Sequence, residues 1–268
     1  MAPILSVKKL GINFGGLQAL DDFNIQVDDN EIVGLIGPNG AGKTTVFNLL
    51  TSVYQPSRGS IRLSGENTKG KKTYEVNMSG IARTFQNIRL FNNISVLDNV
   101  KIALHHGMNY TIVGTIFRLP SYWKQEKLAN ERALELLSVF SMQDMADVKA
   151  GSLPYGAQRR LEIVRALATN PKVLLLDEPA AGMNPSETTE LMNTIHDIRD
   201  RFKIAIILIE HDMNLVMGIC ERILVLNYGL IIAAGTPDEI KSNPIVIEAY
   251  LGQQRMDDTP FNPDYDRR

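Results

Sequence analysis

Short, nearly continuous apolar runs alternate along this chain with longer segments whose apolar residues recur every three or four positions. The runs lie at Glu31–Gly37, Lys172–Pro179, Lys203–Asp212 and Ile223–Leu226. Such a run is typical of a strand that is covered on both faces. Helical spacing follows the first run, at Val46, Leu49, Leu50 and Val53, and helical segments separate the later runs. This alternation predicts an α/β fold with a mainly parallel, doubly covered sheet.

The pattern also divides the chain. Strands are expected near the start, at Leu5–Val7 and Ile25–Val27, on either side of the turn-rich residues 11–16 and the acidic pair Asp21 and Asp22. Residues 55–59 break the first helix, and a strand is expected at Ser60–Leu63. From about residue 88 to 152 the strand-like runs disappear and helical periodicity takes over.

We therefore expect a single domain over residues 1–252, with a core of residues 1–87 and 153–252 and a helical subdomain at about 88–152. Asn184 and Thr236 each precede a proline and lie three residues before a glutamate, which predicts two helix starts. Residues 253–268 are polar and interrupted by proline, and we expect a poorly ordered tail there.

Composition and charge narrow the function. The 28 Lys and Arg nearly balance the 30 Asp and Glu, which removes the electrostatic reason to expect nucleic acid as a partner. No apolar run reaches the ~18 residues that a membrane span needs, and the first residues lack the apolar core of a signal peptide. The one cysteine, Cys220, excludes an intrachain disulfide and fits a reducing compartment. A cytoplasmic setting is expected.

The strongest motif is a phosphate-binding loop between the first apolar run and the helix after it. It consists of Gly37, Pro38, Asn39, Gly40, Ala41, Gly42, Lys43, Thr44 and Thr45. Gly40 and Gly42 are expected to let backbone N–H groups approach a phosphate, and the helix presents its positive end to the same group. Lys43 is suited to the β- and γ-phosphate oxygens and Thr44 to Mg²⁺. The alternative is a glycine-rich turn that matches by chance.

A second pair of candidates follows the next apolar run. Asp177 and Glu178 come at the carboxyl end of this strand, where open α/β sheets bind ligands. Asp177 is placed to hold Mg²⁺, and Glu178 to polarise an attacking water. Taken alone, the two carboxylates could be a solvated exit from the sheet. Together with the phosphate loop they predict a nucleotide site, which many P-loop enzymes share.

Four further motifs make the chain resemble the ATP-binding cassette family over residues 4 to 250. Gln86, within RTFQNIRLF, resembles the glutamine at the joint between core and helical subdomain. LPYGAQRR, Leu153–Arg160, is similar to the family's signature motif, and AAGMNP, Ala180–Pro185, to its D-loop. His211, in IEHD, resembles the switch histidine. FGGLQAL, YGAQRRLEIVRAL and LIEHDMNLVMGI look most like the ATPase subunits of branched-chain amino-acid importers.

The resemblance implies a RecA-like P-loop core with an antiparallel β subdomain and a helical insertion. It implies that Glu178 and His211 act in hydrolysis, with His211 contacting the γ-phosphate, and that Gln86 senses Mg²⁺ or water beside Thr44 and Asp177. The signature residues would act on the ATP of a partner subunit. They are Leu153, Tyr155, Gly156, Ala157 and Gln158. Phe14 is our candidate for stacking on adenine.

This signature departs from the common form. Pro154 replaces a serine, Tyr155 a glycine and Ala157 a glutamine, so the contact would depend on backbone N–H groups near Gly156, with Gln158 as a further candidate.

Each of these residues also has a structural alternative. The signature could be a plain helix N-terminus with a packing glycine, and His211 the polar end of a strand. Gln86 could be a surface amide and Phe14 a core residue. Asn184, where the family has aspartate, could be only a helix cap. Asp212 is suited to cap the next helix, whose apolar face would place Cys220 in the core.

The implied activity is hydrolysis of ATP, with Mg²⁺, coupled to import of branched-chain amino acids or a related small polar solute. The implied partners are a second ATPase subunit, two membrane permease subunits docked near Gln86 to Asn99, and an extracytoplasmic solute-binding protein, with no nucleic acid. The location would be the cytoplasmic face of the membrane. One alternative is a soluble ATPase of this family acting on nucleic acid or ribosomes, and another is a P-loop small-molecule kinase.

Overall fold

A computed structural model describes residues 2–105 and 120–257, and the side chains of 2–105 and 120–250. The described strands form two sheets. The larger has six strands in the order β10-β9-β3-β8-β7-β6. Their bounds are β3 Ile32–Ile36, β6 Ile81–Arg83, β7 Val173–Asp177, β8 Ala205–Ile209, β9 Arg222–Asn227 and β10 Leu230–Gly235. All neighbours pair in parallel except β9 and β10, which confirms the mainly parallel sheet.

The large sheet is covered on both faces. Along β8, Ala205, Ile207 and Ile209 are buried in one apolar cluster, with α1 (Lys43–Leu50) and the smaller sheet. The alternating residues Ile206 and Leu208 are buried in a second apolar cluster, with α6 (Tyr155–Ala168) and α7 (Pro185–Phe202). Alternate residues of a strand point to opposite faces, so β8 must be apolar throughout.

The smaller sheet is antiparallel, in the order β2-β1-β4-β5, which confirms the antiparallel β subdomain. Its strands are β1 Leu5–Phe14, β2 Leu17–Val27, β4 Arg58–Leu63 and β5 Glu66–Asn67. The turn expected over residues 11–16 is shorter in the structure: only residues 15 and 16 separate β1 from β2. Gly11 is a strand residue whose added Cβ would lie 2.6 Å from Nε of Arg58, so this glycine reflects close packing.

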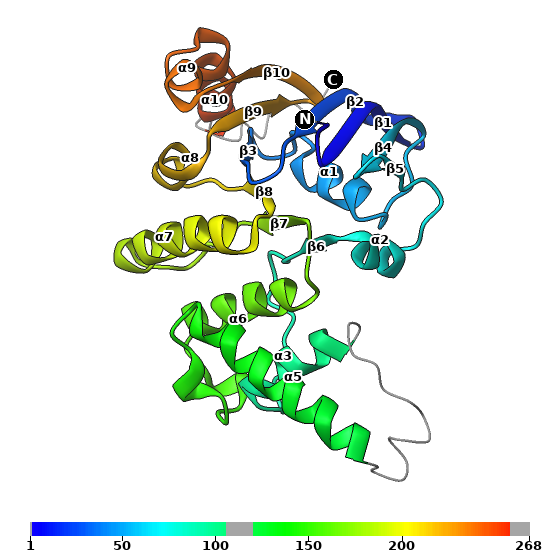
Figure 1. Cartoon of the computed structure of the whole chain (residues 1–268). Coiled ribbons are helices and arrows are strands. Elements are labelled where there is room, and N and C mark those ends of the chain that lie inside the picture. The colour runs from blue at the N-terminus through cyan, green and yellow to red at the C-terminus, as the bar shows by residue number, and fades with distance from the viewer. Residues whose placement is uncertain (1, 106–119, 258–268) are drawn as a thin grey trace, which may run out of the picture.

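Between β6 and β7, the regular elements of the described residues are all helices, as Figure 1 shows in the lower part of the molecule. The described α-helices there are α3 (Val96–Leu104), α5 (Pro120–Ser138) and α6 (Tyr155–Ala168), with short 3₁₀ turns at Gln143–Met145 and Ala150–Ser152. α6 lies between the sheet and the other helices of this unit in Figure 1. The remaining helices are α2 (Thr73–Ser79), α7 (Pro185–Phe202), α8 (Met213–Ile219), α9 (Pro237–Lys241) and α10 (Pro244–Asp257).

The helix starts agree with the sequence. Asn184 and Thr236 each accept a hydrogen bond from the backbone N–H three residues later and complete a capping box with a glutamate. Asp212 caps α8, and Cys220 is 5% exposed. Burial raises the pKa of the Cys220 thiol to about 12, as expected of a core cysteine.

Three expectations need correction. α1 ends at Leu50, and Val53 is 48% exposed, because the chain turns away at Thr51. β6 and β10 were not predicted; β6 has three residues and β10 is an edge strand. α10 extends to Asp257, so residues 253–257 belong to a helix, consistent with the helix-forming residues there. Residues 258–268 lie outside the described part. No helix of the described residues is both long and apolar enough to cross a membrane.

Candidate active site

Four neighbouring strands of the large sheet supply the candidate site from their carboxyl ends. β3 leads into the phosphate loop, β8 into His211, β7 into Asp177 and Glu178, and β6 towards Gln86. These strands are adjacent in the order β3-β8-β7-β6, and all of them run in parallel. Ligands of open α/β sheets bind at this edge.

The ammonium group of Lys43 folds back over the phosphate loop. Its Nζ donates to the carbonyl oxygens of Gly37 and Pro38, at 2.7 and 2.9 Å, and the residue is 7% exposed. Burial lowers the pKa of Lys43, and the carboxylates of Glu178 and Asp177 act in the opposite direction. The loop therefore holds a buried cation close to the acidic strand end.

The glycines of the loop have different roles. A Cβ added to Gly40 would meet no heavy atom of the described residues within 4 Å, so this position is open to an approaching group. A Cβ on Gly42 would lie 3.1 Å from the carbonyl oxygen of Ala19, and one on Gly37 only 2.0 Å from that of Leu226. The expectation that Gly42 makes room for phosphate is thus corrected, because its hydrogen faces protein. Positive φ angles at all three positions also favour glycine.

The start of α1 is suited to an anion. Its N-cap, Gly42, receives no side-chain cap from the described residues, and no acidic residue lies in the first turn. By contrast, α7 and α9 begin with capping boxes completed by Glu187 and Glu239, and at α2 the Glu75 carboxylate accepts the backbone N–H of Lys72. The positive end of α1 is left for an external acceptor. Thr44 is exposed and Thr45 half-buried at this end; in the loop, Asn39 is exposed whereas Pro38 and Ala41 are buried.

Asp177 is held by an arginine that the sequence analysis missed. Its Oδ2 lies 2.8 Å from Nη2 of Arg83, and both side chains are almost fully buried. Nη1 of Arg83 donates to Oδ1 of Asn48 on α1 at 2.7 Å. The backbone N–H of Asp177 donates to the Thr84 hydroxyl at 3.2 Å. Arg83 thereby ties the acidic strand end to the helix that follows the phosphate loop; its only sequence signal was its place at the start of RTFQNIRLF.

Glu178 lies between two of the predicted residues. Its Oε1 is 2.9 Å from Nε2 of His211, and its Oε2 accepts a hydrogen bond of 2.9 Å from Nε2 of Gln86. The Glu178 backbone has a φ of 50°, in the left-handed region that non-glycine residues seldom adopt. The structure thus brings Glu178, His211 and Gln86 together from three strand ends. Three independent, solvated side chains would have no reason to meet in this way.

A second unpredicted carboxylate, Glu210, precedes the histidine. It is 4% exposed and accepts backbone N–H groups of Ala180, His211 and Asp212, at 2.8, 2.9 and 3.4 Å. Burial raises the pKa of Glu210 above its usual value, although these hydrogen bonds act in the opposite direction. Glu210 joins the start of the D-loop to the backbone of His211. The apolar strand before it gave no hint that this glutamate turns inward.

Phe14 is not a core residue. It ends β1, is 42% exposed, and its ring meets Tyr54 edge-on with centroids 5.1 Å apart. The core alternative is therefore excluded, and Tyr54 is a neighbour that the sequence analysis did not single out.

The signature residues surround the start of α6. Pro154 is its N-cap, without a side-chain hydrogen bond among the described residues, and Tyr155 is 48% exposed. Leu153 and Ala157 are buried in the core, so their side chains face away from any external ligand. Gln158 donates from Nε2 to the Leu153 carbonyl at 2.9 Å and is thereby engaged within its own helix start. A Cβ on Gly156 would lie 3.0 Å from Oε1 of Glu187.

Comparisons with known proteins agree with this arrangement. A model of the ABC transporter family matches residues 20–181. The high-affinity branched-chain amino acid transport ATP-binding protein BraF of Pseudomonas aeruginosa is 46% identical over 94% of this chain and 98% of its own length. The chain belongs to the ABC transporter family. The corresponding ATP-binding protein LivG of Escherichia coli K12 is 45% identical over the same shares of the two chains.

Two further matches extend the likeness of this ABC ATPase beyond the shared motifs. A model described as branched-chain amino acid ATP-binding cassette transporter matches residues 231–255, which include most of β10 and most of α10. The crystal structure of an ATP-binding cassette of an ABC transporter, in its ADP conformation, superposes with a TM-score of 0.82 at 30% identity. It covers 94% of this chain and 100% of that one. As a member of this family, the chain binds ATP and hydrolyses it to drive transport.

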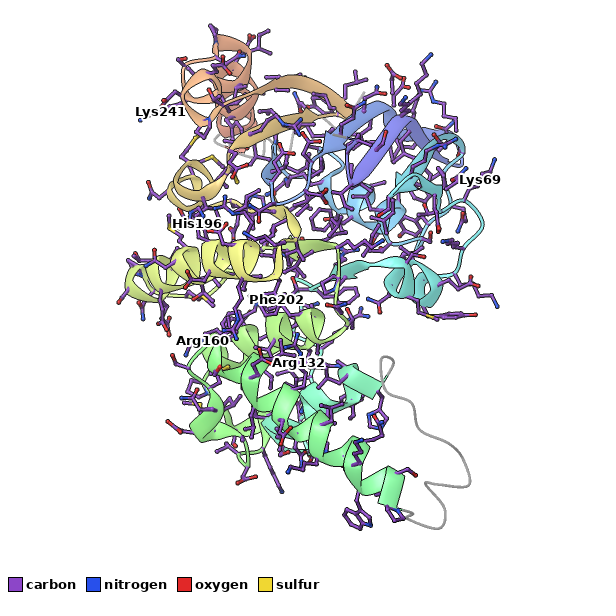
Figure 2. All side chains as sticks on the ribbon, viewed as in Figure 1. Lys69, Arg132, Arg160, His196, Phe202 and Lys241 are labelled. Carbon is purple, nitrogen blue, oxygen red and sulfur yellow. The ribbon has the colours of Figure 1, made fainter. Side chains whose placement is uncertain are left out.

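We predict that Arg83→Met destabilises this ABC ATPase by about 3–5 kcal/mol, because the buried Asp177 carboxylate would lose its partner. Urea unfolding followed by circular dichroism measures the change. The control is Arg160→Met on α6, whose ion pair with Glu190 of α7 is partly exposed and whose side chain lies between the two helices in Figure 2. The control should lose about 0–1 kcal/mol. Equal losses for the two variants would contradict a special role for the Arg83 pair.

Proposed function

We propose that this chain is the ATP-hydrolysing subunit of an importer for branched-chain amino acids or a related small polar solute. The support is that BraF and LivG, at 46% and 45% identity over 94% of this chain, are branched-chain amino acid transport ATP-binding proteins. The match of residues 231–255 to the branched-chain transporter model adds a region outside the general ABC motifs.

Within the site, we assign Glu178 as the general base for the attacking water. The observation that carries this assignment is that Gln86 and His211 hold the two carboxylate oxygens from either side. Each carboxylate oxygen accepts about two hydrogen bonds, so each can still accept one from a water. Glu178 would take the proton of that water, and His211, 45% exposed at its side chain, would contact the γ-phosphate.

The phosphate loop would bind the triphosphate through Gly40, Lys43 and the N–H groups at the start of α1. The residues present also fit Mg²⁺, because this ion prefers oxygen ligands, and Thr44 on α1 and Asp177 at the end of β7 offer a hydroxyl and a carboxylate. Gln86, our further candidate ligand, contacts Glu178 through its amide nitrogen. When bound, Mg²⁺ would neutralise charge on the phosphate oxygens. Phe14 remains our candidate for stacking on adenine.

We propose that two ATPase subunits, identical or related, sandwich the nucleotides. The signature start of α6 would face the partner's ATP with its backbone N–H groups near Gly156, since Pro154 has no hydroxyl to donate. Two features support this: α6 has no acidic residue in its first turn, and among the described side chains none caps it.

The proposed membrane partners are two permease subunits docked near Gln86 to Asn99. Phe91 in this segment is 49% exposed and lies 5.0 Å from the Arg165 guanidinium, a surface suited to a partly apolar partner. We place the complex on the cytoplasmic face of the membrane, with an extracytoplasmic solute-binding protein. The alternative of a nucleic-acid-dependent ATPase draws no support from BraF and LivG, which are transport proteins.

Glu178→Gln should keep ATP affinity and lower kcat about 10²–10⁴-fold, because the amide cannot accept the proton of the water. Equilibrium binding of a fluorescent ATP analogue and steady-state phosphate release measure the two effects. Glu190→Gln, at an exposed position of α7, is the control and should behave as wild type. Normal turnover of Glu178→Gln would remove the assigned base.

The transport assignment is tested by co-expressing the tagged chain with candidate permease subunits and purifying it in detergent. We expect a stable complex whose ATPase rate, after reconstitution with a solute-binding protein, rises when leucine, isoleucine or valine is added. The same complex carrying Glu178→Gln should show no stimulation. A rate that responds to nucleic acid and to no amino acid would favour the alternative.

A further inference from the structure

Two buried charged residues of α6, Arg159 and Glu162, form hydrogen bonds with the backbone of Phe85 and Gln86. Nη1 of Arg159 donates to the Phe85 carbonyl at 2.6 Å, and Nη2 donates to the Gln86 carbonyl. Glu162, one turn later on α6, accepts the Phe85 backbone N–H on its Oε1 at 3.2 Å. The same two side chains form an ion pair of 3.3 Å. Phe85 and Gln86 are thus held through three backbone groups.

This grip is internal to the protein. The Arg159 side chain is 3% exposed and that of Glu162 is 7% exposed, so both charges have been removed from water. Burying such a pair costs free energy that the attraction between the two charges does not always repay. The two side chains also satisfy three backbone groups of Phe85 and Gln86, so their placement fixes the position of this segment.

The gripped segment leads directly to the candidate base. The amide of Gln86 donates to Glu178, so a shift of the Gln86 backbone moves one of the two groups that orient this carboxylate. The Gln86 backbone is hydrogen-bonded to Arg159 on α6, and its side chain is hydrogen-bonded to Glu178, the residue after β7. The Gln86 side chain is exposed.

The other end of the connection lies at the start of α6. The Tyr155 ring is 5.6 Å from the Arg159 guanidinium. A Cβ on Gly182 of the D-loop would lie 2.9 Å from the same ring, so Tyr155 packs against the D-loop backbone. Contacts therefore run without a break from Gly182 through Tyr155 and Arg159 to Gln86 and Glu178.

We propose that Arg159 is a positioning residue that sets Gln86, and through it Glu178, according to the placement of the amino end of α6. The inference rests on the proposed roles of Glu178 as base and of α6 as the element facing a partner's nucleotide. A helix moves as a unit, so a nucleotide of the partner that repositions Gly156 also repositions Arg159. Each site would thereby register that the opposite site has closed.

The planar guanidinium is suited to this task because its two terminal nitrogens reach two successive carbonyls at once. A lysine at this place keeps the charge beside Glu162 but offers a single nitrogen. Arg159→Lys therefore changes the hold on the Gln86 backbone with little change in buried charge.

The test is a double-mutant cycle of Arg159→Lys and Gln86→Ala on the ATPase activity of the full chain. Arg159→Lys should lower kcat about tenfold with KM for ATP unchanged within about twofold. In the Gln86→Ala background the same substitution should have no further effect, because a residue that acts through Gln86 has nothing left to position. Arg160→Lys, the next residue on α6, is the control and should leave kcat unchanged.

An equal fall in kcat with and without Gln86 would overturn the proposal, as would a rise in KM with kcat preserved. If Arg159→Lys does not fold, Glu162→Gln replaces it: its amide oxygen can still accept the Phe85 N–H, but the charge beside Arg159 is lost. It should give a smaller fall in kcat that again disappears with Gln86→Ala, and a persisting fall would overturn the proposal. Glu178→Gln, measured in parallel, distinguishes failure of the assigned base from failure of the positioning role of Arg159. Wild-type turnover of Glu178→Gln would refute the assigned base, whatever the result for Arg159→Lys.

Discussion

The positions of the phosphate loop, the acidic pair, His211 and Gln86 depend on the parallel pairing of β3, β8, β7 and β6. The register places Val33 beside Ile207 and Asp177 beside Ile209, so neighbouring strands end at almost the same level. The phosphate loop, the acidic pair, His211 and the segment to Gln86 must therefore emerge at one edge of the sheet. Apolar clusters on both faces fix the strands, because a shift of one residue would turn the residues of each face towards the other.

This constraint explains which parts of the fold could be read from the sequence. β3, β7 and β8 are short apolar strands, and glycine or an acidic residue marks the end of each. This pattern was sufficient to find them. β6 has three residues and gains its identity from pairing with β7, about ninety positions later. β10 was missed for a similar reason, since its half-buried residues become a strand only beside β9.

The site divides in the same way. The residues of the phosphate loop and the acidic strand end follow from local motifs, because each motif lies on one strand end. Gln86, His211 and Glu178 were each predicted, but their mutual contacts join residues up to 92 positions apart and could not be derived from spacing. Arg83, Arg159 and Glu210 lie inside the quoted motifs, but the motifs did not single them out. Their importance lies in burial and in the backbone or carboxylate groups they meet.

Buried charge recurs around this site, and in each case it fixes a loop relative to a rigid element. Arg83 joins Asp177 to α1, Glu210 joins the Ala180 backbone to that of His211, and Arg159 joins α6 to Gln86. Such links suit the proposed arrangement, in which the loops would keep their relative positions while α6 responds to a neighbouring subunit. The central claim is that the nucleotide completes a contact between two copies of this site or between this site and a related one.

Light scattering on purified Glu178→Gln, without permease subunits, tests that claim most directly. The account predicts that the assembly gains one ATPase subunit when Mg-ATP is saturating and loses it again when ADP replaces ATP. An assembly whose mass is the same with Mg-ATP, with ADP and without nucleotide would contradict it.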